Sequence, residues 1–222
     1  MRVLVICAHP DEETLGVGGT LLKHRSQRDE LYWIIVTRAH QPKWSEKVIE
    51  EKDAEIERVA EAYGIKKYFP LKFPAALLDG VPFDEIIKKI DDVVAAVKPD
   101  VVYVVNGGDI HTDHHAVFRA VLSVLKPFRL KDLGVKRVLT FESLSSTEAS
   151  PHVIAGAFSP TVFIDITGYI DKKIEIMEYY KTESQEDPLP RGPGAIRALA
   201  RFRGATIGVD YAEAFMLLYT IG

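Results

Sequence analysis

The residues best suited to chemistry in this sequence are one imidazole and several carboxylates that directly follow an apolar run. The run, Val3 to Ala8, is short, continuous and rich in β-branched residues, which predicts a buried strand. Pro10 cannot donate to a sheet, so the strand ends before it. The polar groups then lie in the loop at the carboxyl end of the strand, where open α/β sheets bind ligands. They are His9, Asp11, Glu12 and Glu13. Packing alone does not require such a cluster, so the loop indicates a metal site.

A second polar cluster follows another apolar run, at residues 100–105, and contains Asp109, His111, Asp113, His114 and His115. Imidazole nitrogens and carboxylate oxygens are typical zinc ligands, and a catalytic zinc site combines three of them with an open position for water. A neighbouring carboxylate that does not bind the ion can act as a general base. Spacing alone does not choose between His114 and His115, because either could share a helical face with His111.

The rest of the chain must bring these two loops together. Further apolar runs predict strands at 31–37, 68–71, 135–141, 161–166 and 214–220, and helical periodicity occurs at 16–28, 46–63, 83–97, 116–125, 168–181 and 194–202. Alternating strands and helices of this length indicate crossover units. We therefore expect an α/β fold: a single Rossmann-like domain over residues 1–222, with a mostly parallel sheet and helices on both faces. The glycines after the first cluster lack the spacing of a nucleotide-binding loop, which favours close packing at Gly16, Gly18 and Gly19.

Composition excludes several classes of protein. The net charge is -4 and there is no large Lys/Arg cluster, so binding to nucleic acid is not expected. No apolar stretch approaches the ~20 residues of a membrane-spanning helix. Cys7 is the only cysteine, which rules out an intrachain disulfide and suits a cytoplasmic protein. Asn106 is the only asparagine, and the scarcity of thermolabile amides predicts a thermophilic source.

Both clusters resemble motifs of a known family, the LmbE-like or PIG-L zinc-dependent N-acetylglucosaminyl deacetylases. Ala8-His-Pro-Asp-Glu-Glu13 is similar to that family's Ala-His-Pro-Asp-Asp-Glu, and His111-Thr-Asp-His114 resembles its His-x-Asp-His. The resemblance covers the chain nearly end to end. There are two departures: Glu12 stands where the family usually has Asp, and Thr37-Arg-Ala-His40 replaces the common Thr-x-Gly-Glu.

The resemblance implies a role for each matching residue. His9, Glu12 and His114 would hold Zn²⁺, and Asp11 would be the general base. His111 would stabilise or protonate the tetrahedral intermediate, with Asp113 orienting or tuning it. The implied substrate is an acetylated amino sugar or glycoconjugate that loses acetate, and the family favours a homo-oligomer.

Two other functions remain open on the sequence alone. A metal-dependent phosphatase could use Asp109 and Glu13 as ligands of a second ion. A non-catalytic metal-binding or sugar-binding protein is the other alternative, because Glu12 departs from the family pattern. Arg38, Trp44 and Arg191 are candidates to grip a sugar or its anionic substituent, although residues of these types are more often structural.

Overall fold

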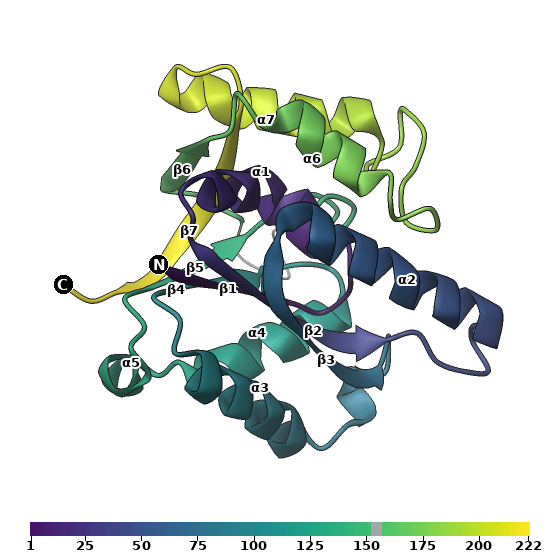
Figure 1. The fold of residues 1–222 in the computed structure, drawn as a ribbon, viewed down its shortest axis with the longest axis vertical. Coiled ribbons are helices and arrows are strands. Elements are labelled where there is room, and N and C mark those ends of the chain that lie inside the picture. Colours follow the sequence, from purple (N-terminus) through teal and green to yellow (C-terminus); the bar gives the residue numbers. More distant parts are fainter. Residues whose placement is uncertain (152–156) are drawn as a thin grey trace.

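The computed structural model describes residues 1–151 and 157–222, which fold around one seven-stranded sheet (Figure 1). The strand order is β3-β2-β1-β4-β5-β7-β6. The strands are β1 (Arg2–Cys7), β2 (Glu30–Arg38), β3 (Ile65–Pro74), β4 (Val101–Val105), β5 (Arg137–Phe141), β6 (Val162–Asp165) and β7 (Ala212–Thr220). Strands β1 to β5 pair in parallel, whereas β7 runs antiparallel to both β5 and β6. The sheet is therefore mostly parallel.

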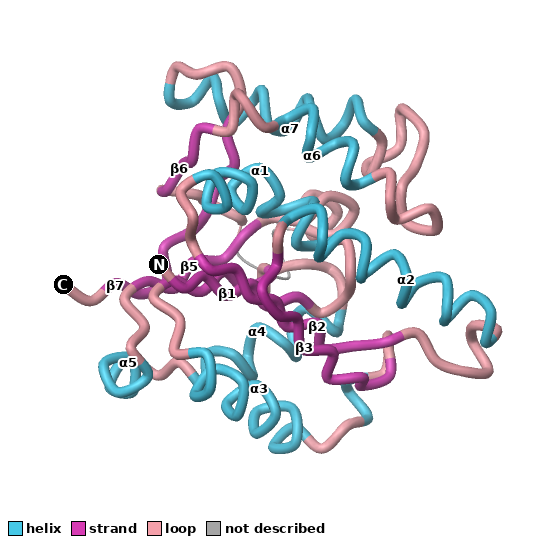
Figure 2. Tube along the Cα trace, in the orientation of Figure 1, coloured by secondary structure: helices cyan, strands magenta, loops and turns pink. Residues whose placement is uncertain are grey.

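Helices cover both faces of the sheet (Figures 1 and 2). One face carries α1 (Glu12–Ser26), α2 (Glu46–Tyr63), α6 (Ile170–Met177) and α7 (Pro193–Ile207), and the other carries α3 (Phe83–Val97), α4 (Thr112–Val124) and α5 (Pro127–Leu133). A short 3-10 turn, η1 (Leu78–Gly80), precedes α3. The Rossmann-like α/β architecture expected from the sequence is confirmed. In the described residues, no helix is both long and apolar enough to cross a lipid bilayer.

Among the elements that differ from the sequence prediction are α1 and α5. Helix α1 begins at Glu12 rather than near Gly16, because the Asp11 carbonyl accepts hydrogen bonds from the backbone N–H groups of Thr14 (3.0 Å) and Leu15 (2.9 Å). The first polar cluster thus includes the first turn of a helix, where carboxylates are favoured by the helix dipole. Helix α5 lies outside the sequence prediction, which ends a helix before Pro127. Proline is also favoured in the first turn of a helix, and here it opens α5.

The topology brings the two polar loops together. From β1 the chain builds the sheet in one direction through β2 and β3, and from β4 it builds in the other direction through β5. Strands β1 and β4 are parallel neighbours, with Ile6 opposite Val104. The loops that leave their carboxyl ends are therefore adjacent, at the switch point where open α/β sheets form a binding crevice.

The glycines after the first cluster let α1 pack closely, as predicted. A Cβ atom on Gly16 would lie 2.1 Å from Cδ2 of Phe141, and one on Gly18 would lie 2.6 Å from the Tyr63 hydroxyl. Both neighbours belong to the buried core. The α1 backbone thus packs directly against these core side chains, and this contact fixes the position of the first polar cluster relative to the sheet.

A buried ion pair holds the middle of α1 against the rest of the fold. Lys173 Nζ donates to the Leu15 carbonyl (2.8 Å) and to Glu213 Oε1 (2.7 Å). Glu213 also accepts the backbone N–H groups of Gly19 (2.8 Å) and Thr20 (2.7 Å). Lys173 and Glu213 are only 3% and 5% exposed. The pair therefore satisfies backbone groups inside α1 and ties α6 and β7 to it.

We expect the Lys173→Met variant to lower the free energy of unfolding by about 3–5 kcal/mol, because Glu213 would be left as a buried charge without its cation. Urea denaturation measures this change. Lys172→Met is the matched control, because Lys172 pairs with Glu175 at 2.7 Å where both side chains are about half exposed. Such an exposed pair contributes about 0–1 kcal/mol. Equal losses in the two variants would contradict a special role for the buried pair.

Candidate metal and catalytic site

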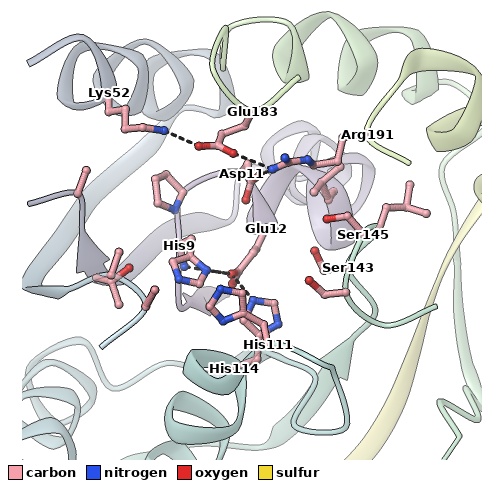
Figure 3. Close-up of a pocket in the computed structure, with 18 of the residues that line it drawn as sticks. His9, Asp11, Glu12, Lys52, His111, His114, Ser143, Ser145, Glu183 and Arg191 are labelled. Atoms are coloured by element: carbon pink, nitrogen blue, oxygen red, sulfur yellow. Dashed lines mark hydrogen bonds and ion pairs between the residues drawn. The ribbon is translucent and has the colours of Figure 1, made fainter. Parts of the chain in front are cut away.

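Three side chains from the two loops converge at the carboxyl edge of β1 and β4 (Figure 3). Glu12 Oε1 lies 2.8 Å from His9 Nδ1 and 2.8 Å from His114 Nε2. Glu12 and His114 are buried, whereas His9 is 21% exposed. The carboxylate of Glu12 thus sits between two imidazoles that come from opposite sides of the switch point.

Each of these imidazoles has a second carboxylate behind it. His9 Nε2 lies 2.9 Å from Asp113 Oδ2, and His114 Nδ1 lies 2.7 Å from Asp109 Oδ2. Asp109 is itself held by the Asn106 side-chain amide, which donates to its Oδ1 at 2.9 Å. A histidine that binds a metal usually donates its other ring nitrogen to such a partner, which fixes the direction of the ring. The arrangement aims His9 Nδ1 and His114 Nε2 at one point.

The donor set fits a zinc ion. Two histidine nitrogens and one carboxylate oxygen are a common catalytic zinc ligand set. Metal–ligand bonds of about 2.0–2.1 Å place tetrahedral ligand atoms about 3.3 Å apart. Glu12 Oε1 lies 2.8 Å from each of the two histidine nitrogens, so these distances would have to increase only slightly to admit the ion. Glu12 reaches this position with its extra methylene because its Oε2 accepts the Ala8 N–H at 2.8 Å, which folds the side chain back over the end of β1.

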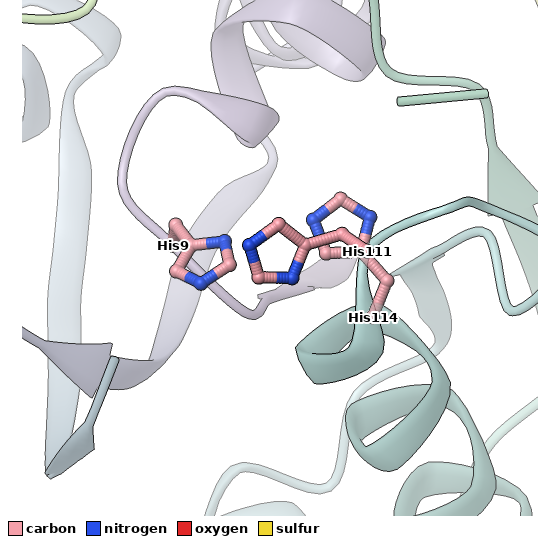
Figure 4. A group of neighbouring side chains, drawn as sticks. All are labelled: His9, His111 and His114. Atoms are coloured by element: carbon pink, nitrogen blue, oxygen red, sulfur yellow. The ribbon is translucent and has the colours of Figure 1, made fainter. Parts of the chain in front are cut away.

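His111 provides a third imidazole at the same place (Figure 4). Ligand nitrogens of His9, His111 and His114 all lie within 4.8 Å of one another, so these three histidines form a second possible ligand set. The rings of His111 and His114 are stacked with centroids 5.0 Å apart. His115 lies outside the cluster, because its Nε2 contacts the Asp109 carbonyl. The structure thus brings His114 beside His9 and leaves His115 outside the cluster. Residue spacing alone had not distinguished His114 from His115.

The electrostatics of the site also suit a cation. Burial disfavours a charged imidazole, but hydrogen bonds to Asp113 and Glu12 outweigh it and raise the pKa of His9 to about 9. Burial acts in the same way on His114, where Glu12 and Asp109 raise the pKa to about 10. The carboxylates therefore hold protons on both rings at neutral pH. A metal ion at the ring nitrogens would displace those protons, so its affinity should increase with pH.

Asp11 lies beside this cluster in a strained backbone conformation. Its φ is 102°, a value that non-glycine residues rarely adopt and that often marks a functional position. Its N–H donates to Glu13 Oε2 at 3.1 Å. Although Asp11 is the N-cap of α1, its side chain makes no capping hydrogen bond. The carboxylate is thus not used to cap α1, and Asp11 lines the pocket. Burial, together with the charges of Glu183 and Glu12, raises its pKa to about 8.

His111 and Asp113 lie at the start of α4 and contact each other through the backbone. His111 is the N-cap of α4, and its Nδ1 accepts the backbone N–H of Asp113 at 3.2 Å. Burial lowers the pKa of His111 to about 4, and the nearby His9 and His114 act in the same direction. The ring is therefore neutral, with its proton on Nε2. The Asp113 carboxylate makes no hydrogen bond to His111, although its charge acts on that ring. It contacts His9 and accepts the N–H groups of Ala76 (2.6 Å) and Leu78 (3.2 Å).

The cluster forms the floor of a pocket of about 330 Å³. Of the residues proposed to grip a sugar, Trp44 and Arg191 line this pocket, whereas the Arg38 guanidinium is paired with Asp53. The wall also includes residues that the sequence interpretation did not single out: Lys52, Ser143, Ser145, Ser146 and Glu183. The serines follow β5, so the rule that applied to the loops after β1 and β4 could have found them. Lys52 and Glu183 carry no such signal.

Comparison with known proteins identifies the family of this chain. The family model "PIG-L: GlcNAc-PI de-N-acetylase" matches residues 4–125, more than half of the chain. The chain belongs to the PIG-L family. The matched segment of this PIG-L protein contains both polar loops, and the candidate metal and base residues therefore lie within it.

Individual relatives match 82% or more of this chain. The diacetylchitobiose deacetylase of Thermococcus kodakarensis is 26% identical over 96% of this chain and 81% of its own. A probable N-acetyl-alpha-D-glucosaminyl L-malate deacetylase of Bacillus anthracis is 22% identical over 82% of this chain and 81% of its own. Among solved structures, a conserved protein of Thermus thermophilus superposes with a TM-score of 0.79 and is 26% identical in sequence. The superposition covers 99% of this chain and 96% of the other. The likeness therefore extends beyond the matched segment to α6, α7 and β7.

Proposed function

We propose that this PIG-L protein is a zinc-dependent hydrolase that removes the N-acetyl group from an N-acetylglucosamine-containing sugar or glycoconjugate and releases acetate. The observation that carries the proposal is the convergence of His9 Nδ1, Glu12 Oε1 and His114 Nε2. The carboxylate of Asp11, which does not cap α1, lies in the same pocket. The names of the two deacetylase relatives support the substrate class.

Each residue at the site would have a separate task. His9, Glu12 and His114 would hold zinc, which when bound polarises a carbonyl and lowers the pKa of water. Asp11 would accept the proton of the attacking water and later deliver it to the departing amine. His111, neutral and protonated on Nε2, would donate to the oxygen that becomes negative in the tetrahedral intermediate. Asp113 and Asp109 would hold His9 and His114 in place.

The geometry gives less support to a two-metal phosphatase. Such an enzyme needs carboxylates free to bridge two ions about 3.5–4 Å apart. Asp109 is already engaged by His114 and Asn106. Glu13 is buried and accepts hydrogen bonds from Tyr180, Thr14 and the Asp11 N–H. We therefore propose one ion per chain. A thermophilic source, a cytoplasmic location, a homo-oligomeric assembly and one deacetylase domain over residues 1–222 stay predictions from the sequence.

A screen of N-acetylated sugars, with acetate detected on the zinc-loaded protein, tests the proposal. N-acetylglucosamine, its disaccharide and N-acetylglucosamine glycosides of small acids are the first substrates to include. We expect acetate release that stops with a chelator, returns with zinc and requires about one ion per chain. Turnover that continues in the metal-free protein, or two ions per chain with phosphatase activity, would refute the assignment.

A further inference from the structure

The loop between α6 and α7 places an arginine against the candidate base (Figure 3). Arg191 Nη1 donates to Asp11 Oδ2 at 3.1 Å and to Glu183 Oε2 at 2.7 Å. The other oxygen of Glu183 contacts Lys52 Nζ, which extends from α2. Lys52 also donates to the Thr182 hydroxyl at 2.8 Å. The four side chains form a continuous row of alternating charge, from Lys52 through Glu183 and Arg191 to Asp11.

The row is well shielded from solvent, unlike an ordinary surface ion pair. The side chain of Arg191 is 22% exposed, that of Glu183 is 26% exposed and that of Asp11 is 8% exposed. Lys52 is also shielded, with 13% of its side chain exposed. Charges in such surroundings are screened much less by salt than exposed ones. The contacts therefore constrain where the carboxylate of Asp11 can lie.

Nothing else in the described residues fixes the direction of that carboxylate. The Asp11 side chain makes no capping bond to α1, and Glu13 holds only the backbone N–H. Within the described part of the chain, Arg191 is the group that donates to the carboxylate, and it binds Oδ2. Oδ1 accepts no hydrogen bond from the described residues, and Asp11 lines the pocket, where a general base needs an unoccupied oxygen.

We propose that Arg191, anchored through Glu183 to Lys52, is a positioning residue that holds the Asp11 carboxylate in the orientation required for proton transfer. This inference rests on the proposed deacetylase function. It differs from the expectation that Arg191 grips the sugar, because the nitrogen that reaches Asp11 is already shared between two carboxylates. Arg191 acts on the reaction through Asp11 and need not touch the substrate.

Steady-state kinetics of Arg191→Gln on the zinc-loaded enzyme test the proposal. We expect kcat to fall about 100-fold, as for a displacement of a catalytic group by about 1 Å, with KM almost unchanged and the zinc content equal to that of the wild type. Arg191→Lys should recover part of kcat, and added guanidinium should partly rescue Arg191→Ala. Lys52→Met should show a smaller loss. Arg197→Gln is the control, because Arg197 on α7 pairs with the exposed Asp171.

Other outcomes would overturn the positioning role. A raised KM with normal kcat in Arg191→Gln would show that Arg191 binds substrate. A lower melting temperature with wild-type kcat in the folded protein would show that the row only stabilises the fold. If the wild type turns over no acetylated sugar, the proposed function and the positioning role fail together. A normal Arg191→Gln enzyme beside an active wild type removes the positioning role alone.

Discussion

Replacing Asp11 by asparagine is expected to lower kcat by about 10²–10⁴-fold while the protein keeps its zinc. The amide has nearly the shape of the carboxylate but cannot accept the proton of the attacking water. Asp11 is 5% exposed and does not cap α1, so the substitution removes neither a helix cap nor a surface charge. Acetate release measured at saturating substrate, together with the zinc content per chain, separates loss of the base from loss of the metal.

Asp79→Asn is the matched control for this experiment, because Asp79 is exposed in η1. We expect the control to match the wild type. If Asp11→Asn retained full activity, Asp11 would not be the base. If neither the wild type nor the variant hydrolysed any acetylated amino sugar, the non-catalytic binding protein would become the better interpretation of the site.

The sheet and the location of the site could be predicted from the sequence because their signals are local. The apolar runs of β1 and β4 identify buried strands, and each run ends in residues that a core cannot accept. The alternation of strands and helices indicates a mostly parallel sheet whose carboxyl edge binds ligands, whereas the pairing of β1 with β4 comes from the structure. Short-range patterns thus predicted that both polar loops lie at strand ends, whereas the choice of His114 over His115 needed the family resemblance.

The remaining parts of the site depend on contacts between residues distant in sequence. The Asp113 carboxylate turns to His9 because the backbone N–H groups of Ala76 and Leu78 receive it, and nothing near residue 113 in the sequence signals those groups. Glu183 meets Lys52 through a loop whose path over α2 is set by tertiary packing. The start of α1 inside the first motif likewise depends on the positive φ of Asp11, which no residue-type preference predicts.

His114→Ala should reduce zinc affinity by more than about 100-fold, because removal of only an outer partner of a ligand already costs about 10–100-fold. His114 is 2% exposed and its Nε2 lies 2.8 Å from Glu12 Oε1, so the substitution removes a nitrogen from the centre of the cluster. Competition with a zinc-binding dye measures the affinity without depending on catalysis. Loss of activity should follow in parallel, since the same ion is required for the reaction.

Two further variants test whether the loss of zinc affinity is specific to His114. Asp109→Asn should weaken zinc binding by about 10–100-fold, because His114 Nδ1 would lose the carboxylate that lies 2.7 Å away. His115→Ala should bind zinc like the wild type, because the His115 ring contacts the Asp109 carbonyl and lies outside the cluster. Unchanged affinity in His114→Ala, with a loss in His115→Ala, would show that the other imidazole is the ligand. Zinc affinity that is intact in both His114→Ala and His115→Ala would favour a site formed by His9, Glu12 and His111. His111 would then bind the ion and could not also donate a hydrogen bond to the developing oxyanion.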